Sequence, residues 1–209
     1  MLCGFTFSAF FRFLYCVNCW ITFFNIIQKH SVITTQYFLF LLVFCYNEFM
    51  EINYMYTKEI IEKLSSNHKT ISFAESCTGG RIVAAFTAIS GASEILNGSC
   101  ITYSNQIKHE WLGVDNDILE AFGAVSQECV SQMLTGIQKM ANSDYALAVS
   151  GIAGPTGGTK DKPVGTVYIG LLTPSTQEVF QCLFHGEREH IQEQSTAYAI
   201  AKLAEVLDI

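Results

Sequence analysis

Charged residues are scarce in this sequence, and basic residues are scarcer still. Only 15% of the 209 residues are Asp, Glu, Lys or Arg, and 12 basic residues stand against 19 acidic ones, for a net charge of −7. A protein that holds nucleic acid along its backbone needs a basic face, so we expect no nucleic-acid partner. Half of the residues are hydrophobic, which excludes disorder as the general state of the chain.

The common metal, disulfide and phosphate signatures are also missing. Cys16 and Cys19 have C-x-x-C spacing, but no second Cys or His pair follows at the spacing of a zinc site. The other cysteines are scattered and do not resemble a disulfide framework, which favours a reducing compartment. Neither a Walker loop nor a G-x-G-x-x-G motif is present. We therefore expect no metal site and neither of these two kinds of nucleotide site.

Residues 1–49 differ in composition from the rest of the chain. They hold 11 of the 16 Phe, and their only charged residues are Arg12, Lys29 and Glu48. The apolar stretch 5–27 has the length of a membrane span but contains Arg12, and the stretch 32–46 is short for one. We therefore treat 1–49 as an apolar extension and 50–209 as a separate domain.

Three interpretations of the extension stay open. It is a membrane hairpin or anchor, a buried extension, or the product of a start site placed too early, since AT-rich noncoding DNA encodes much Phe, Tyr, Ile, Asn and Cys. Met50 and Met55 offer later starts, and an amphipathic sequence follows Met50. A membrane partner and a membrane-anchored location are expected only if the extension is real.

Hydrophobic periodicity predicts that helices and strands alternate through residues 50–209. The predicted helices cover 56–67, 78–89, 105–112, 115–121, 126–141 and 187–207. The predicted strands cover 70–75, 98–103, 146–150, 164–172 and 178–184, with a hairpin turn near Pro174. This order predicts a three-layer α/β domain with a mixed sheet.

The first candidate site follows the strand 70–75. It consists of Glu75, Ser76, Thr78, Gly79 and Gly80. Ligands bind at the carboxyl ends of strands in open α/β sheets, and the amides at a helix start attract anions. Two glycines allow the backbone to approach a ligand closely. The plain alternative is a strand-to-helix turn capped by Ser or Thr.

The second candidate consists of Tyr103 and Lys108, again just after a strand. A lysine removed from water has a lowered pKa and can act as a base. The plain alternative is a surface lysine beside a tyrosine at the rim of the domain.

The third candidate is the loop that follows the strand 146–150. Its Gly-rich part can surround a ligand with backbone groups, and the plain alternative is a flexible connection. The candidate residues are Ser150, Gly151, Gly154, Gly157 and Gly158. We expect Lys160, Asp161 and Lys162 to extend the loop as a solvated tip.

All three candidates follow strands, and parallel neighbours bring their carboxyl ends to one edge of a sheet. Ser76 can then be a nucleophile and Lys108 its base, with Tyr103 relaying or positioning the proton and the Gly79 and Gly80 amides receiving an oxyanion. This is a serine–lysine form of acyl transfer.

Two rival groups lie beside these residues. Cys77 neighbours Ser76 and is intrinsically more nucleophilic. The residues leave the choice between Ser76 and Cys77 open. His109 neighbours Lys108, but no partner residue accompanies it.

Three blocks carry a resemblance to a known family: Ala74-Glu75-Ser76 with Thr78-Gly79-Gly80, Tyr103-Ser104-Asn105 with Lys108, and Gly151 to Gly158. In this order and spacing they resemble the C-terminal domain of the competence/damage-inducible CinA family, in its stand-alone amidohydrolase form. The resemblance extends over about residues 57–207.

The resemblance implies a fold and an activity. The fold is a three-layer α/β/α domain with a mixed, mostly parallel five-stranded sheet, often dimeric. The activity is hydrolysis of the carboxamide of nicotinamide mononucleotide to nicotinate mononucleotide and ammonia, in cytoplasmic pyridine-nucleotide recycling. It needs neither a metal nor an organic cofactor.

The resemblance also assigns residues. Ser76, Tyr103 and Lys108 match the family's catalytic residues, and Ser150 matches a Ser or Thr near the substrate. The last helix of the family usually begins G-x-R-x-x-(I/V)-R, and this sequence has Arg188 at the first Arg position but Gln192 at the second. If the second Arg holds phosphate, affinity or activity is reduced here. The competing hypothesis is a non-catalytic nucleotide-binding or partner-binding module that kept the fold.

Overall fold

The computed structural model describes residues 53–209 of the chain. The interpretations of residues 1–49 lie outside the described residues. Residues 53–66 are helical, and Ile60, Ile61 and Leu64 on this helix are buried, as the predicted apolar stripe requires. Within residues 53–209, no helix has both the length and the hydropathy needed to cross a membrane.

Helices and strands alternate as predicted. The strands are β1 (Ile71–Glu75), β2 (Leu96–Ile101), β3 (Tyr145–Gly151), β4 (Thr166–Leu172) and β5 (Gln177–Leu183). The helices are α4 (Arg81–Thr87), α5 (Asn105–Leu112), α6 (Asn116–Ala121), α7 (Gln127–Ala141) and α8 (Arg188–Val206), with a short 3₁₀ helix at Ala92–Glu94. Most boundaries lie within two residues of the prediction.

The five strands form one mixed sheet in the order β2-β1-β3-β4-β5. β1 pairs in parallel with β2 and with β3, whereas the β3–β4 and β4–β5 pairs are antiparallel. The expected mixed sheet of five strands is confirmed, but only half of its pairings are parallel rather than most. The reason is that β4 turns back beside β3, and the hairpin then adds β5 at the edge.

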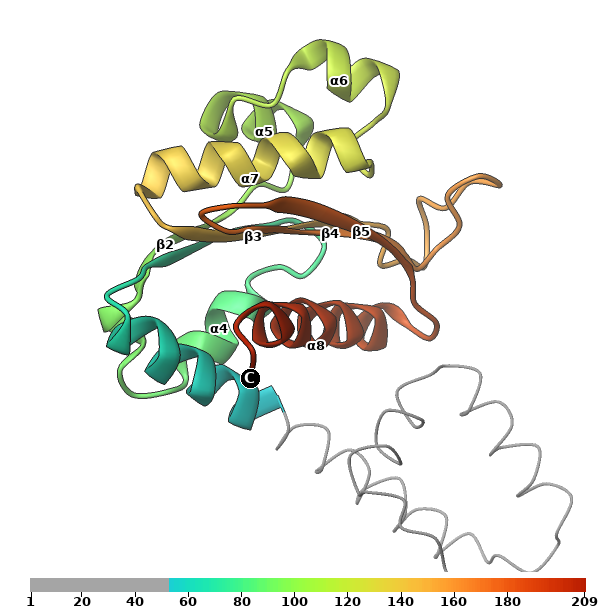
Figure 1. The fold of residues 1–209 in the computed structure, drawn as a ribbon. Helices are drawn as coiled ribbons and strands as arrows, with labels where there is room; N and C mark the ends of the chain where they lie inside the picture. Colours follow the sequence, from blue (N-terminus) through green and yellow to red (C-terminus); the bar gives the residue numbers. More distant parts are fainter. Residues whose placement is uncertain (1–52) are drawn as a thin grey trace, which may run out of the picture. The chain divides into compact units, whose positions relative to one another are not determined.

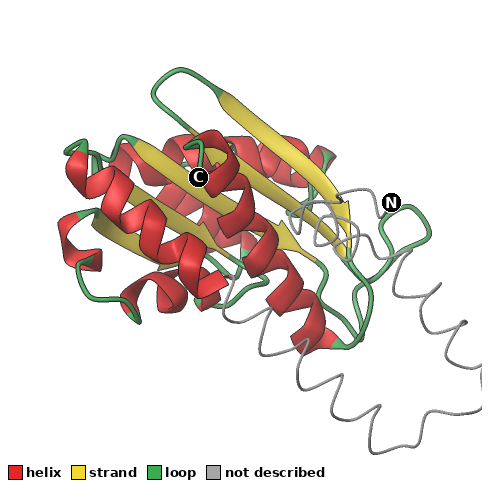
Figure 2. Cartoon of the chain, turned by 60° about the horizontal axis from the view of Figure 1, so that its bottom comes forward, coloured by secondary structure: helices red, strands yellow, loops and turns green. Residues whose placement is uncertain are grey.

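Helices cover both faces of the sheet (Figures 1 and 2). On one face α7 lies against the strands with α5 and α6 beside it, and on the other lie α4, α8 and the helix 53–66. Each face has its own buried cluster. Phe73, Ile82 and Ile200 belong to the cluster under α4 and α8, and Val130 and Met133 belong to the cluster under α7.

The strand register brings three chain segments to one edge of the sheet. Glu75, at the end of β1, is level with Ile101 of β2 and with Val149 of β3. The next residue of each segment therefore lies near the carboxyl end of its strand, on the same edge of the sheet: Ser76, Thr102 and Ser150. The loop 152–165 projects from this end (Figure 1).

Candidate active site

The turn between β1 and α4 is built around a buried carboxylate. Glu75 is fully buried, and its two oxygens accept hydrogen bonds from the Thr78 hydroxyl at 2.7 Å and from three amides. The amides belong to Gly80 at 3.0 Å, Ile82 at 3.2 Å and Val83 at 2.9 Å. A carboxylate is favourable at a helix N-terminus because it satisfies donors that the helix leaves free. Glu75 therefore organises the turn that carries Ser76.

Gly79 and Gly80 allow the chain to make this turn. Their φ angles are +64° and +95°, a region that residues with a Cβ rarely adopt. The Gly79 amide donates to the Ser76 carbonyl at 3.1 Å, and the Gly80 amide donates to Glu75. Both amides are thus committed within the turn, and neither is free for the oxyanion role expected from the sequence.

Ser76 and Lys108 meet at the centre of the site. The Lys108 Nζ lies 3.0 Å from the Ser76 Oγ and donates to the Thr102 carbonyl at 2.6 Å. Lys108 is 1% exposed and Ser76 is 8% exposed. Lys108 reaches this point from the first turns of α5, a helix capped by the Ser104 hydroxyl. The structure therefore brings the expected nucleophile and base into contact.

Burial makes the charged form of this lysine less favourable. Removal from water lowers the pKa of Lys108, and the thiols of Cys129 and Cys77 oppose that shift only in part. A charged ammonium is disfavoured in such surroundings. The lysine is therefore suited to accept a proton from Ser76, as a general base must.

The neighbouring thiol is a poor rival to Ser76. Cys77 is buried, and burial raises the pKa of its thiol to about 12. The thiolate is the reactive form of cysteine, so Cys77 is held unreactive near neutral pH. His109 is also occupied, because its Nδ1 lies 2.7 Å from the Val114 carbonyl.

Tyr103 lies at the mouth of the site and contacts Arg188. Tyr103 is 63% exposed, and its hydroxyl accepts a hydrogen bond from Arg188 Nη2 at 2.8 Å. Arg188 Nη1 donates to the Gly154 carbonyl, also at 2.8 Å. The guanidinium therefore links the loop after β2 to the loop after β3. Both acceptors are neutral, so its positive charge stays available to an anion.

The candidate residues of the Gly-rich loop range from buried to exposed. Ser150 is buried, and its hydroxyl donates to the Ala124 carbonyl at 2.7 Å. At Gly151 an added Cβ would lie 2.7 Å from Val167 Cγ2 and 2.9 Å from the Thr166 carbonyl, so glycine is needed there for the close approach of β4. Gly157 and Gly158 lie in the exposed part of the loop.

Lys162 makes hydrogen bonds that the sequence did not predict. Its Nζ donates to the carbonyls of Phe122 at 2.8 Å and Val125 at 2.6 Å. Lys162 was expected in a solvated loop tip, but it joins that loop to the connection between α6 and α7. Together with the Ser150 hydroxyl, it holds the start and the far end of the loop against residues 122–125.

Gln192 also makes a hydrogen bond that the sequence did not reveal. It is 8% exposed, and its Nε2 donates to the Cys77 carbonyl at 2.6 Å. Gln192 follows Arg188 by one turn of α8, so one helix face contacts all three candidate loops. A glutamine on a helix gives no sign in sequence that its partner is a backbone carbonyl 115 positions away.

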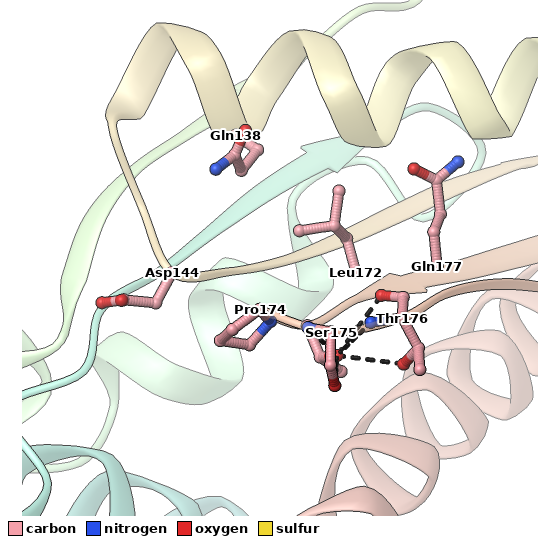
Figure 3. Close-up of a pocket in the computed structure, with 8 residues that line it drawn as sticks. Gln138, Asp144, Leu172, Pro174, Ser175, Thr176 and Gln177 are labelled. Atoms are coloured by element: carbon pink, nitrogen blue, oxygen red, sulfur yellow. Dashed lines mark hydrogen bonds between the residues drawn. The ribbon is translucent and has the colours of Figure 1, made fainter.

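A different hollow lies at the opposite end of the sheet, beside the β4–β5 turn (Figure 3). It encloses about 350 Å³ and is lined by Gln138, Asp144 and residues 172–177. Its polar groups are engaged within the protein: Gln138 donates to the Ser143 carbonyl, and Asp144 accepts from Lys69 and Thr70. We assign no ligand to this hollow.

Known proteins resemble this chain over the described domain. Residues 53–207 match the family described as the CinA C-terminal domain. A CinA-like protein of Pseudothermotoga lettingae is 45% identical over 141 residues, which are 68% of this chain and 35% of that protein. A CinA-like protein of Endomicrobium trichonymphae is 50% identical over 137 residues, which are 66% of this chain and 32% of that protein. The chain thus spans about a third of the length of these relatives.

Solved structures match the same region. A CinA-superfamily protein from Klebsiella pneumoniae has a TM-score of 0.72 and 33% identity, covering 75% of this chain and 98% of that one. A competence/damage-inducible protein from Agrobacterium tumefaciens has the same TM-score and identity, covering 75% of this chain and 96% of that one.

Proposed function

Because the chain belongs to the family of CinA C-terminal domains, we propose that it hydrolyses the carboxamide of nicotinamide mononucleotide. The products are nicotinate mononucleotide and ammonia, and we place the reaction in cytoplasmic pyridine-nucleotide recycling. The observation that carries the proposal is the buried contact of 3.0 Å between Lys108 Nζ and Ser76 Oγ. A serine beside a lysine of lowered pKa has the groups that amide hydrolysis through an acyl-enzyme needs.

The first half of the reaction transfers the acyl group to the protein. Neutral Lys108 takes the proton of the Ser76 hydroxyl as Oγ attacks the carboxamide carbon. The tetrahedral intermediate collapses when its C–N bond breaks, and Lys108 returns the proton to the departing nitrogen, which leaves as ammonia. An acyl ester on Ser76 remains.

The second half repeats the proton transfers with water. Lys108 takes a proton from a water molecule, whose oxygen attacks the ester carbonyl. Collapse breaks the bond between Ser76 and the acyl carbon, and Ser76 recovers a proton from Lys108. The product is released as a carboxylic acid, which loses its remaining proton to solvent and becomes the carboxylate. One residue thus serves as base and then as acid in each half.

Arg188 is proposed to hold the substrate's phosphate. Its guanidinium donates to the Tyr103 hydroxyl and the Gly154 carbonyl, and neither acceptor carries a charge. Guanidinium groups bind phosphate well because charge and hydrogen bonding act together. In this proposal Tyr103 orients Arg188 and flanks the substrate. In this proposal the exposed parts of the β1–α4 turn and of the Gly-rich loop form the walls, through Gly79, Gly80, Gly157 and Gly158. Behind them, Glu75, Thr78, Ser150, Gly151 and Gly154 hold the two segments in shape.

The test is turnover of nicotinamide mononucleotide by the full chain, with ammonia and nicotinate mononucleotide both measured. Ser76→Ala and Lys108→Met are each expected to lower kcat/KM by about 10³-fold or more. Ser93→Ala and Lys139→Met, which alter exposed residues, should match the parent. A folded parent that binds the nucleotide without releasing ammonia would instead support the non-catalytic binding module.

The phosphate role has its own test. Nicotinamide riboside carries the same carboxamide but no phosphate. Arg188→Met should raise KM for the mononucleotide about tenfold or more and leave kcat/KM for the riboside nearly unchanged. An equal loss on both substrates would show that Arg188 acts on something other than phosphate.

A further inference from the structure

Thr102 carries a buried hydroxyl that has no hydrogen-bond partner. Thr102 has no exposed surface, and in the part of the chain that the structure describes its Oγ1 is the one buried side-chain oxygen or nitrogen left unpaired. Buried polar groups are almost always hydrogen-bonded, because leaving one unpaired costs free energy. A hydroxyl kept unpaired inside the domain therefore needs an explanation.

The backbone of Thr102 is engaged at the centre of the site. Its amide donates to the Glu75 carbonyl at 2.8 Å, which continues the pairing of β1 with β2. Its carbonyl accepts Lys108 Nζ at 2.6 Å, and the same Nζ lies 3.0 Å from Ser76 Oγ. The hydroxyl is joined to that carbonyl through Cα and Cβ alone, so it lies in the neighbourhood of the Lys108 amine.

The side chain of Thr102 belongs to the face of the sheet from which Lys108 approaches. Successive side chains along a strand point to opposite faces. Ile101 lies toward α4, since its Cδ1 would be 3.1 Å from a Cβ added to Gly80, and Cys100 packs against the cluster under α7. Thr102 therefore shares the face of Cys100, which α5 and α7 cover (Figure 1), and Lys108 is a residue of α5.

Lys108 lacks one acceptor when it carries a proton. A lysine ammonium has three N–H donors. Within residues 53–209, Lys108 Nζ has two hydrogen-bond partners, the Ser76 hydroxyl and the Thr102 carbonyl. Uptake of the Ser76 proton therefore leaves a third donor without an acceptor, on a residue that is only 1% exposed.

We propose that the Thr102 hydroxyl accepts this third N–H of the Lys108 ammonium and that Thr102 is a positioning residue that stabilises Lys108 in its protonated form. The inference rests on the proposed function insofar as Lys108 is the base for Ser76. Rotation about the Cα–Cβ bond moves the hydroxyl between staggered positions, so the bond can form when the proton arrives and break when it leaves. Thr102 does not touch the substrate.

The ionisable groups around Lys108 do not supply this acceptor. Cys77 faces it from the β1–α4 turn and Cys129 from α7, and burial raises the pKa of these thiols to about 12 and about 11. Both thiols are therefore neutral near pH 7. Glu75, at the end of β1, is occupied by donors of its own turn, and the guanidinium of Arg188 on α8 accepts no hydrogen bond.

The titration of Lys108 tests this role without any substrate. It is followed in the full chain by ¹³C spectra of protein that carries ¹³Cε-labelled lysine, and Lys108→Met identifies the signal. Thr102→Val removes the hydroxyl at similar shape and should move the titration to lower pH, because the charged form loses an acceptor. Thr102→Ser keeps the hydroxyl and should titrate close to the parent.

Thr57→Val is the matched control. Thr57 is also buried, but its hydroxyl donates to the Asn53 carbonyl at 2.8 Å. This variant should lower Tm and leave the titration of Lys108 unchanged. Thr102→Val should instead raise Tm where Lys108 is neutral, because it removes an unpaired hydroxyl. That gain should shrink as pH falls and the lysine of the parent takes up its proton.

Turnover of the nucleotide gives a second measurement. Thr102→Val should lower kcat/KM about tenfold on the plateau at high pH, because its lysine is a weaker base. The difference from the parent should narrow at lower pH, where more of the lysine in the variant is neutral. Thr102→Ser should stay within about threefold of the parent at every pH.

Two results would overturn the proposal: an unmoved Lys108 titration in folded Thr102→Val, or a folded Thr102→Ser that titrates like Thr102→Val. Thr102→Ala also lacks the hydroxyl and carries the same expectation if Thr102→Val fails to fold. A parent that hydrolyses the nucleotide while its titration ignores Thr102→Val would overturn the role of Thr102 and leave the proposed function standing. A titration that moves as expected, in a parent that does not hydrolyse the nucleotide, would support the hydrogen bond and overturn the substrate assignment.

Discussion

The Lys108 Nζ lies 3.0 Å from the Ser76 hydroxyl oxygen, although the two residues are 32 positions apart in the chain. Parallel pairing of β1 with β2 brings the two segments to one edge of the sheet. Burial then removes Lys108 from water and leaves the Ser76 hydroxyl and the Thr102 carbonyl as its polar contacts. This pair carries the proposed chemistry, and its protonation should control the rate.

Activity should therefore depend on the charge of Lys108. Burial lowers the pKa of Lys108 below its ordinary value of 10.5, and only the neutral amine can accept the Ser76 proton. The value of kcat/KM should rise with pH through that lowered pKa and reach a plateau below pH 10.5. A pH–rate profile measures this dependence. An increase in kcat/KM centred at the ordinary lysine pKa would contradict the role of Lys108 as the base.

Replacement of the neighbouring thiol should leave activity nearly intact. Cys77→Ala removes a buried thiol whose pKa is raised to about 12 by burial, while keeping the backbone amide of residue 77. We expect kcat/KM within about threefold of the parent, and we expect iodoacetamide at pH 8 to leave the parent active. Loss of activity in a folded Cys77→Ala, comparable to that of Ser76→Ala, would make the thiol the nucleophile.

Loss of the Lys162 contact should loosen the Gly-rich loop. Lys162→Met removes two hydrogen bonds to the carbonyls of Phe122 and Val125, so the loop that carries Gly154 and supports Arg188 becomes less ordered. We expect KM for the nucleotide to rise about five- to tenfold with a smaller change in kcat, because binding must then order the loop. Lys160→Met changes an exposed lysine of the same loop and should have no effect. Equal KM values for the two variants would show that this contact does not shape the site.

The acid stability of the domain should depend on Asp144. The Lys69 hydrogen bond is the largest cause that lowers the pKa of Asp144, with further bonds from Thr70. A lowered folded-state pKa means that this stabilisation is present above the ordinary carboxyl pKa and is lost as pH falls through the folded value. Asp144→Asn should therefore lower Tm at pH 7 and narrow its difference from the parent below about pH 4. Parallel Tm curves across this range would contradict the assignment.

Hydrophobic periodicity predicted most of the fold. The predicted span 105–112 agrees with α5, and the helix predicted to begin at Ser126 is α7, where the Ser126 hydroxyl accepts from the Cys129 amide. Strand limits were less accurate, with β2 starting at Leu96 rather than residue 98. The share of parallel pairings was overestimated, because strand direction depends on how the connections run and not on the composition of each strand.

The candidate site was predicted in part. Ser76 and Lys108 stand beside predicted strand ends, and the expectation that they meet agrees with the structure. Glu75 was expected among the substrate-binding residues, but it binds the amides of its own turn. Gln192 and Lys162 escaped prediction because their partners are backbone carbonyls, and every residue has one.

The sequence by itself determined the order of the helices and strands and the three polar segments that follow β1, β2 and β3, because periodicity and turn residues act over a few positions. Only the tertiary structure decided that Ser76 contacts Lys108 while the thiol of Cys77 is held with a raised pKa. It also decided that Arg188 joins Tyr103 to Gly154. These outcomes depend on burial and on distances between segments far apart in the chain, which form only when the sheet and α8 pack together.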